Sequence, residues 1–99
     1  WQKGVPCWLR SSSECYEPKA GIWAPAPSMT MSRSGHAGAV LAGQLLVCGG
    51  VGRAGEAVEA LRSMERFDPA ARIWEALPPM LLPRDAPAAA AVAGRLYVC

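Results

Sequence analysis

The chain has 99 residues, 52% of them hydrophobic, and a formal net charge of +2 at pH 7. That length allows at most one small domain, and that hydrophobic content is typical of a globular rather than a disordered protein. The small, scattered charge excludes an electrostatic argument for binding nucleic acid or an anionic membrane surface, and no apolar stretch approaches the ~18 residues of a membrane span.

The ends of the sequence predict a piece of a longer protein, and its cysteines bear on metal binding and cellular compartment. The chain begins on Trp1 rather than Met and ends directly after an apolar run, so we expect it to be a piece of a longer protein. Its four cysteines form no C-x-x-C motif and no cluster with the single histidine, which argues against a zinc site. A short secreted chain could be held together by disulfides, but no other feature of the sequence indicates secretion. We therefore expect free thiols and an intracellular, cytoplasmic location.

In chain order, the first informative segment is 14–33, ECYEPKAGIWAPAPSMTMSR. It aligns with 65–84, ERFDPAARIWEALPPMLLPR, at a spacing of 51 residues (65 − 14 = 51). The same spacing continues without a gap from 39–48 to 90–99. A period of this length is the signature of a repeat architecture.

The segments between these copies predict the four strands of one repeat. The first two are apolar runs separated by Ala42-Gly43, a tight-turn signal. The third is followed by the turn-forming Pro69, and the fourth by two prolines, which are typical of a sheet edge or exit. The predicted strands are 36–42 (HAGAVLA), 44–48 (QLLVC), 63–68 (SMERFD) and 73–77 (IWEAL). Four short antiparallel strands in ~50 residues predict a propeller blade.

Side-chain sizes agree with this architecture. A blade is covered on both faces by its neighbours, so its inner strands should be apolar on both sides, as the first two predicted strands are. The rings of Tyr16, Trp23, Phe67 and Trp74 fall on the outer strands, where we expect them to fill the wider gaps between blades. The predicted fold is all-β, a partial propeller of four-stranded antiparallel blades. Because about three repeats are usually needed for stability, we expect the isolated chain to be marginal or aggregation-prone.

A glycine motif lies between the second and third predicted strands. Gly50, Gly52 and Gly55 complete a G-x-G-x-x-G, which can cradle a dinucleotide pyrophosphate when a helix follows it. Only twelve positions separate Gly55 from Asp68, which is tight for a helix and a further strand, and the earlier copy of the repeat has no such motif.

A structural interpretation of these glycines is therefore favoured. We expect Gly49-Gly50 to end a strand at a point where neighbouring backbone leaves no room for a Cβ atom. The following residues, 51–60, are expected to form a loop, with 56–62 a loop or at most a short turn. Met64–Phe67 is expected to be a strand.

These features together resemble the kelch repeat. The residues that carry the resemblance are Arg33, Gly35-His36, Gly49-Gly50, Phe67-Asp68-Pro69 and Trp74. The earlier copy supplies Glu14, Tyr16 and Trp23, whereas the later copy departs from the pattern with Asp85-Ala86-Pro87. The resemblance implies the outer part of a preceding blade over 1–33, one complete kelch blade over 34–80 and the inner strands of the following blade over 81–99. Residues 1–11 would then be a variable loop of the preceding blade.

The resemblance implies a function as well as a fold. It implies a non-catalytic protein-interaction module without cofactor or metal, which in the full-length protein serves as substrate receptor of a cullin-type ubiquitin ligase through a BTB domain. The alternatives are an actin-associated or scaffolding kelch protein, or an enzyme with a dinucleotide or copper site. The sequence has one histidine for a copper site and no constellation of catalytic residues.

A partner surface is expected on one rim of the blade. The loop into the first strand and the loop between the second and third strands lie on the same rim, and these loops differ between the two copies. Variable loops on a rigid scaffold are where binding surfaces usually lie. The candidate contacts for a protein or peptide partner are Ser34, Gly35, Arg53, Glu56, Asp85 and Ala86.

Other polar residues are interpreted as structural. His36 is expected to be a buried, hydrogen-bonded histidine at a blade edge, because no second ligand accompanies it. Arg33 and Arg84 are expected to hold the connection between blades. Glu65 and Asp68 are expected to be polar strand and turn positions rather than a catalytic pair.

Overall fold

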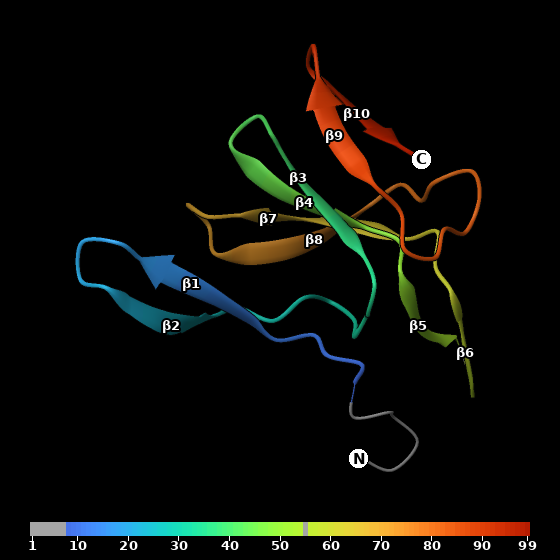
Figure 1. The fold of residues 1–99 in the computed structure, drawn as a ribbon, viewed down its shortest axis with the longest axis horizontal. Helices are drawn as coiled ribbons and strands as arrows, with labels where there is room; N and C mark the ends of the chain where they lie inside the picture. The colour runs from blue at the N-terminus through green and yellow to red at the C-terminus, as the bar shows by residue number, and fades with distance from the viewer. Residues whose placement is uncertain (1–7, 55) are drawn as a thin grey trace.

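The computed structural model describes residues 8–54 and 56–99, and ten short strands account for all regular structure in this part of the chain (Figure 1). In order, the strands are β1 (Ser13–Glu17), β2 (Ile22–Ala26), β3 (Ala37–Leu41), β4 (Gln44–Cys48), β5 (Val51–Ala54), β6 (Ala57–Ala60), β7 (Met64–Asp68), β8 (Ile73–Leu77), β9 (Ala89–Val92) and β10 (Arg95–Val98). No helix in the described residues is long and apolar enough to cross a bilayer.

The centre of the molecule is a four-stranded antiparallel sheet with the order β3-β4-β7-β8. These strands coincide with the four predicted segments, so the predicted blade is confirmed. The turn between β3 and β4 has positive φ at both Ala42 (52°) and Gly43 (75°), as a two-residue type I′ hairpin requires. Between β7 and β8, the carboxylate of Asp68 accepts hydrogen bonds from the backbone N–H groups of Ala70 and Ala71 and closes the turn.

Two antiparallel strand pairs flank this sheet, β1–β2 before it in the chain and β9–β10 after it. The three sheets fan out around a common centre, and β9 contacts β3 (Figure 1). The 51-residue period is visible in their geometry. Tyr16 and Trp23 face each other across β1–β2 with ring centroids 5.2 Å apart, and Phe67 and Trp74 repeat that distance across β7–β8. The all-β fold of a partial propeller is therefore confirmed.

The buried core lies around β4. Its consecutive residues Leu46, Val47 and Cys48 are all buried, although neighbouring residues of a strand point to opposite faces. This sheet is therefore covered on both faces here, as expected for the inner strands of a blade. The Trp74 indole is half-buried and donates a hydrogen bond to the carbonyl of Pro27, 2.8 Å away, in the segment that leaves β2.

The prediction that the rings of the outer strands fill the gaps between blades is wrong for Trp23 within the described residues. This side chain is 64% exposed, whereas the equivalent Trp74 packs on the segment that leaves the preceding strand pair. The physical reason is that burial in a propeller comes from the neighbouring blade, and the described residues include no such neighbour on the far side of β1–β2.

A second correction concerns residues 51–60, which were expected to form a loop. Residues 51–54 and 57–60 instead form the β5–β6 hairpin, with Val51 opposite Ala60 and Arg53 opposite Val58. The hairpin begins where Val51 pairs with Ser34 through two backbone hydrogen bonds of 2.8 and 3.0 Å. Those bonds hold the backbone extended just after the paired glycines, and the strand propagates from there. The predicted strand at Met64–Phe67 is confirmed as part of β7.

Candidate functional site

Three connecting segments meet at one end of the central sheet. The backbone N–H of Ser34, before β3, donates to Val51 at the start of β5, and Val51 donates back to Ser34. The N–H of Gly50 donates to the carbonyl of Arg84, in the segment that leads to β9, over 2.9 Å. We call this end of the sheet, together with the β5–β6 hairpin, the rim.

The paired glycines allow the segments of the rim to approach each other. Both have positive φ, 68° at Gly49 and 84° at Gly50. A Cβ atom on Gly49 would lie 2.8 Å from the Arg84 carbonyl oxygen, and one on Gly50 would lie 2.8 Å from the backbone nitrogen of His36. Real Cβ atoms do not approach backbone so closely. The expectation that these glycines end a strand where there is no room for a side chain is confirmed.

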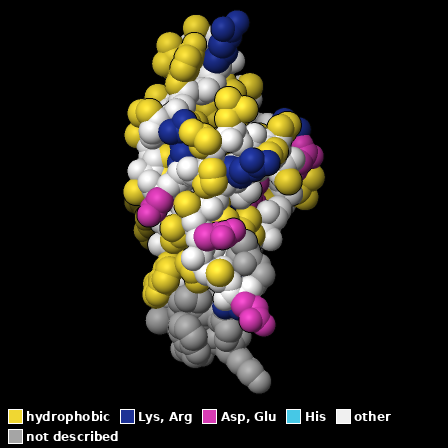
Figure 2. Space-filling model, turned by 90° about the vertical axis from the view of Figure 1, so that its right-hand side faces the viewer, with side chains coloured by type: hydrophobic (Ala, Val, Ile, Leu, Met, Phe, Trp, Pro, Cys, Tyr) yellow, Lys and Arg dark blue, Asp and Glu magenta, His cyan; other side chains and the backbone are white. Residues whose placement is uncertain are grey.

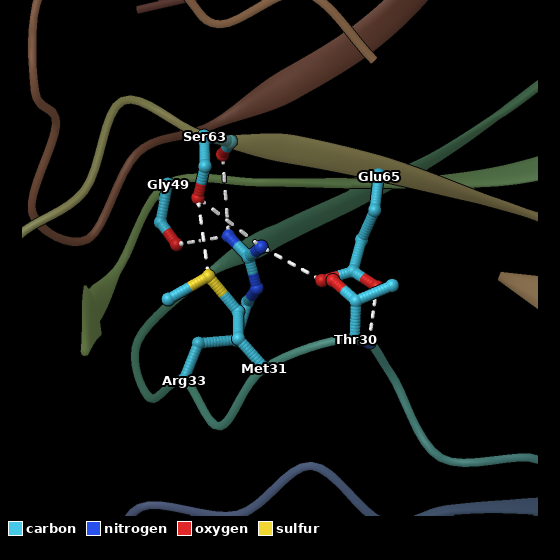
Figure 3. Close-up of polar contacts among 6 residues, drawn as sticks. All are labelled: Thr30, Met31, Arg33, Gly49, Ser63 and Glu65. Carbon is cyan, nitrogen blue, oxygen red and sulfur yellow. Dashed lines mark hydrogen bonds and ion pairs between the residues drawn. The ribbon is translucent and has the colours of Figure 1, made fainter. Parts of the chain in front are cut away.

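A buried ion pair lies directly behind the rim (Figure 3). Arg33 Nη2 is 2.8 Å from Glu65 Oε2, and both side chains are 1% exposed. Arg33 Nη1 donates to the carbonyls of Gly49 and Ser63, at 3.0 and 3.2 Å. The second oxygen of Glu65 accepts the backbone N–H of Thr30 over 2.7 Å. Hydrogen bonds of this kind to nearly every polar atom are what a buried ion pair needs to offset its desolvation.

The ion pair ties together parts of the chain that are far apart in sequence. Arg33 lies in the connection from β2 to β3, Glu65 lies on β7, and the Gly49 carbonyl follows β4. The structural role predicted for Arg33 fits this geometry. Glu65, expected to be an ordinary polar strand position, is instead among the most buried residues of the described chain. The 51-residue spacing of Glu14 from Glu65 and of Arg33 from Arg84 is the one sequence signal that marks both charges as structural.

The structure brings four of the six predicted rim contacts together. Ser34 is bonded to Val51, and the position of a Cβ on Gly35 lies 3.9 Å from the Asp85 carboxylate. Asp85 and Ala86 are both exposed, and Ala86 has a positive φ of 50°. These four candidate residues therefore belong to one continuous surface beside the paired glycines.

The other two candidates, Arg53 and Glu56, lie on the β5–β6 hairpin, which projects away from the central sheet (Figure 1). Arg53 is half-buried on β5, and Glu56 is exposed beside the turn. Figure 2 views the molecule from this side and shows hydrophobic side chains interspersed with basic and acidic ones. A surface of mixed character suits a protein partner better than a polyanion.

His36 departs from its predicted environment, because the residue is exposed rather than buried. Part of its imidazole is nevertheless shielded from water. That shielding, together with the nearby positive charge of Arg33, lowers the pKa of His36 below its usual 6.5, while Glu65 opposes the shift. His36 is therefore largely neutral at pH 7.

Cys48, at the end of β4, is 1% exposed, and burial raises the pKa of its thiol, although the nearby Arg33 opposes the shift. Since the thiolate is the reactive form, we expect Cys48 in the folded chain to react with iodoacetamide at pH 8 at least 10-fold more slowly than the exposed Cys15. Peptide mass spectrometry of timed samples measures both rates. Equal rates in the folded chain would contradict this prediction, and unfolding in urea should make them equal.

The glycine motif at the rim does not have the surroundings of a dinucleotide site. The segment after Gly50 is a β-hairpin, so a strand stands where a dinucleotide site would need the start of a helix. Among residues 8–54 and 56–99, no group of three or more His, Cys, Asp or Glu side chains could hold a metal ion. The first part of the proposed variable loop, residues 1–7, lies outside the described residues.

Comparison with known proteins agrees with the repeat and the fold. The family model described as the Kelch motif matches residues 32–81. Kelch-like protein 33 of Homo sapiens is 41% identical over 58 residues, which cover 59% of this chain. Kelch-like protein 35 of Mus musculus is 37% identical over 76 residues, and Kelch repeat and BTB domain-containing protein 13 of Homo sapiens is 34% identical over 85 residues, covering 77% and 86% of this chain.

This chain matches only a small share of those relatives, namely 10%, 12% and 18% of their respective lengths. Among solved structures, YjhT superposes with a TM-score of 0.75 at 16% sequence identity. That match covers 95% of this chain and 34% of the YjhT chain. At this level of identity the superposition shows a shared fold alone.

Proposed function

Because this chain belongs to the kelch-repeat family, we propose that it is a non-catalytic protein-interaction module whose partner binds at the rim. The observation that carries the proposal is the rim itself. There, a projecting hairpin and the exposed segment around Asp85 are mounted on a sheet made rigid by the Arg33–Glu65 ion pair. Rigid scaffolds that present variable loops are the usual platform for recognition.

The nature of the partner follows from the composition of the rim. Arg53, Glu56 and Asp85 give it both signs of charge, and Ser34 and Gly35 add small uncharged residues. Such a surface fits a protein or an extended peptide that carries its own mixed charges. We propose Ser34, Gly35, Arg53, Glu56, Asp85 and Ala86 as the contact residues.

In the full-length protein, we propose that this module is the substrate receptor of a cullin-type ubiquitin ligase. One relative named for both kelch repeats and a BTB domain supports this more specific role. A cytoplasmic location is part of the proposal, supported by the free thiols of Cys15, Cys48 and Cys99. In the alternative proposal, an actin-associated or scaffolding protein, the same rim binds a different protein partner.

Affinity purification with a charge-reversed rim tests this function. We expect the triple substitution Arg53→Glu, Glu56→Arg and Asp85→Arg, made in the protein that carries this chain, to remove at least 90% of one or more partners, measured by quantitative mass spectrometry. Charge reversal at an interface costs several kcal/mol per juxtaposed like pair, which is enough for this loss. The ligase role further predicts that a cullin is retained and that the lost partner is no longer ubiquitinated.

A matched control reverses charges at the opposite end of the sheets. Lys19 and Arg72 lie in the β1–β2 and β7–β8 turns, away from the rim. Lys19→Glu with Arg72→Glu should leave the same partners bound. Loss of partners with this control, or full retention with the rim variant, would contradict binding at the rim.

A further inference from the structure

The β5–β6 hairpin at the rim has one edge that is tied to the blade and one that is not. On the β5 side, Val51 exchanges two backbone hydrogen bonds with Ser34, so the N–H and C=O groups of Val51 point away from β6. Val51 lies opposite Ala60 of β6. Opposite residues in an antiparallel pair share one orientation, so Val51 and Ala60 form a non-hydrogen-bonded pair. The N–H and C=O groups of Ala60 therefore point away from β5.

Val58, two residues earlier on β6, has the same orientation, because the backbone groups of a strand alternate in direction. β6 thus directs the N–H and C=O groups of Val58 and Ala60 outward. Among residues 8–54 and 56–99, no hydrogen bond reaches these groups from outside the hairpin. The hairpin lies in the middle of the sequence, and the connections at the rim on both sides of the central sheet, 27–36 and 78–88, are described. The outer edge of β6 is therefore a row of backbone donors and acceptors.

This edge lacks the features that usually prevent a strand from pairing with another chain. Exposed edges are commonly protected by lysine, proline or a β-bulge. The outer strands of this fold follow that rule, since β2 contains Pro25 and β8 is followed by Pro78-Pro79. In contrast, β6 (AVEA) contains neither lysine nor proline, and its register with β5 continues from Ala60 to Ala57 without a bulge. The backbone of β6 is therefore suited to accept a further strand.

We propose that an extended segment of the protein partner adds to the outer edge of β6 as a third strand of the hairpin sheet. This inference rests on the proposed function, because it takes the rim as the binding surface, and it specifies how the partner is held there. In strand addition, backbone hydrogen bonds supply affinity, and the alternate side chains of the added strand supply specificity. The backbone groups of Val58 and Ala60 are the ones that bond to the partner.

The charges of the hairpin define the chemistry of that segment. β6 carries one charged residue, Glu59, which is exposed, and the exposed Glu56 directly precedes the strand. The one basic residue of the hairpin, Arg53, lies on β5 and is half-buried. A basic residue of the partner opposite Glu59 would form a favourable cross-strand pair. Aliphatic residues on either side of it would pack beside Val58, which is 39% exposed, and Ala60. The partner segment thus alternates between basic and aliphatic residues.

Peptide selection on the full-length protein tests the mode of binding. The probe is a phage-displayed library of random dodecapeptides, and the peptides that it enriches are synthesised and measured by fluorescence anisotropy. We expect them to share a basic residue flanked by aliphatic ones. Methylation of single backbone nitrogens of the peptide should weaken binding by about 10-fold or more at alternate positions and by less than about threefold between them. This period of two arises because only every second amide of an added strand faces β6.

Substitutions on β6 test the same contact from the side of the protein. Val58→Pro removes the outward N–H group, and proline is tolerated in an edge strand where that group faces solvent. We expect it to weaken peptide binding by about 10-fold or more while the thermal unfolding midpoint of the full-length protein is unchanged. Val58→Thr is the matched control, because it keeps the N–H group and the β-branched shape, and should change affinity by less than about threefold. Glu59→Lys should weaken binding of the basic peptides by about 10-fold or more.

Strand addition is overturned if Val58→Pro and Val58→Thr have equal effects, if N-methylation shows no period of two, or if no basic peptide is enriched. Affinity purification distinguishes this failure from failure of the proposed function. Partners that are lost with the charge-reversed rim but retained with Val58→Pro would leave the rim as the binding surface and exclude strand addition to β6. Partners retained with both variants would contradict both proposals.

Discussion

Replacing Glu65 with Gln is expected to destabilise the fold by about 3–5 kcal/mol, because it leaves the Arg33 guanidinium buried without a counter-charge. Both side chains of the pair are 1% exposed, so water cannot solvate the remaining cation. A loss of this size is a large part of the stability of a small domain. Urea unfolding at a fixed protein concentration, followed by circular dichroism, measures the change.

The exposed ion pair on the same sheet is the matched control. Arg66 and Glu75 pair across β7 and β8, but their side chains are 41% and 48% exposed. Glu75→Gln is therefore expected to cost only about 0–1 kcal/mol. Equal losses for the two Glu→Gln variants would show that burial does not control the contribution of the Arg33–Glu65 pair.

The second large effect is expected at Gly50. Gly50→Ala should destabilise the fold by about 2–5 kcal/mol, of which about 1–2 come from the positive φ and the rest from overpacking against the backbone of His36. The clash lies within the rim, so partner binding should weaken together with stability. The same urea experiment measures the loss of stability.

Gly43→Ala separates the two causes. Gly43 also has a positive φ, 75°, but nothing lies within 4 Å of its Cβ position. Its substitution should therefore cost only the conformational part, about 1–2 kcal/mol. If both alanine variants lose the same stability, the close approach of backbone at Gly50 contributes nothing, and the explanation given for the paired glycines is wrong.

The blade could be predicted because its signals are local or periodic. The apolar runs that became β3 and β4, the turn at Ala42-Gly43 and the strand over Met64–Phe67 each depend on a few neighbouring residues. The repeat also predicted the order of the strands, because two copies of a sequence that share a spacing of 51 residues are expected to adopt the same fold. Predictions of this kind depend on the chain's own propensities and need no partner.

The β5–β6 hairpin could not be predicted in the same way. Residues 51–60 contain glycine and several alanines, which favour strands weakly, and no second copy with the same length guides their alignment. Their extended conformation begins at the two bonds between Ser34 and Val51, a contact between segments 17 residues apart (51 − 34 = 17). The exposures of His36 and Trp23 were misjudged for a related reason, because burial depends on which blade lies next to them.

For the candidate site, the sequence indicated which segments reach the rim, and the structure showed how they meet. Strand parity alone grouped Ser34 and Gly35 with Asp85 and Ala86. The sequence did not reveal that Arg33 and Glu65 form an ion pair. Both residues recur with the repeat, but a repeat shows that a position matters without showing which position it contacts.

The period of 51 residues, the four strands of a blade and the paired glycines at the end of the second strand could all be predicted from the sequence alone. Each of these signals depends on residues that are neighbours in the sequence or that recur at one spacing. The pairing of Arg33 with Glu65 and the hairpin that projects from the rim became visible only in three dimensions. Those features depend on contacts between distant segments, whose free energies are set by burial and charge in three dimensions.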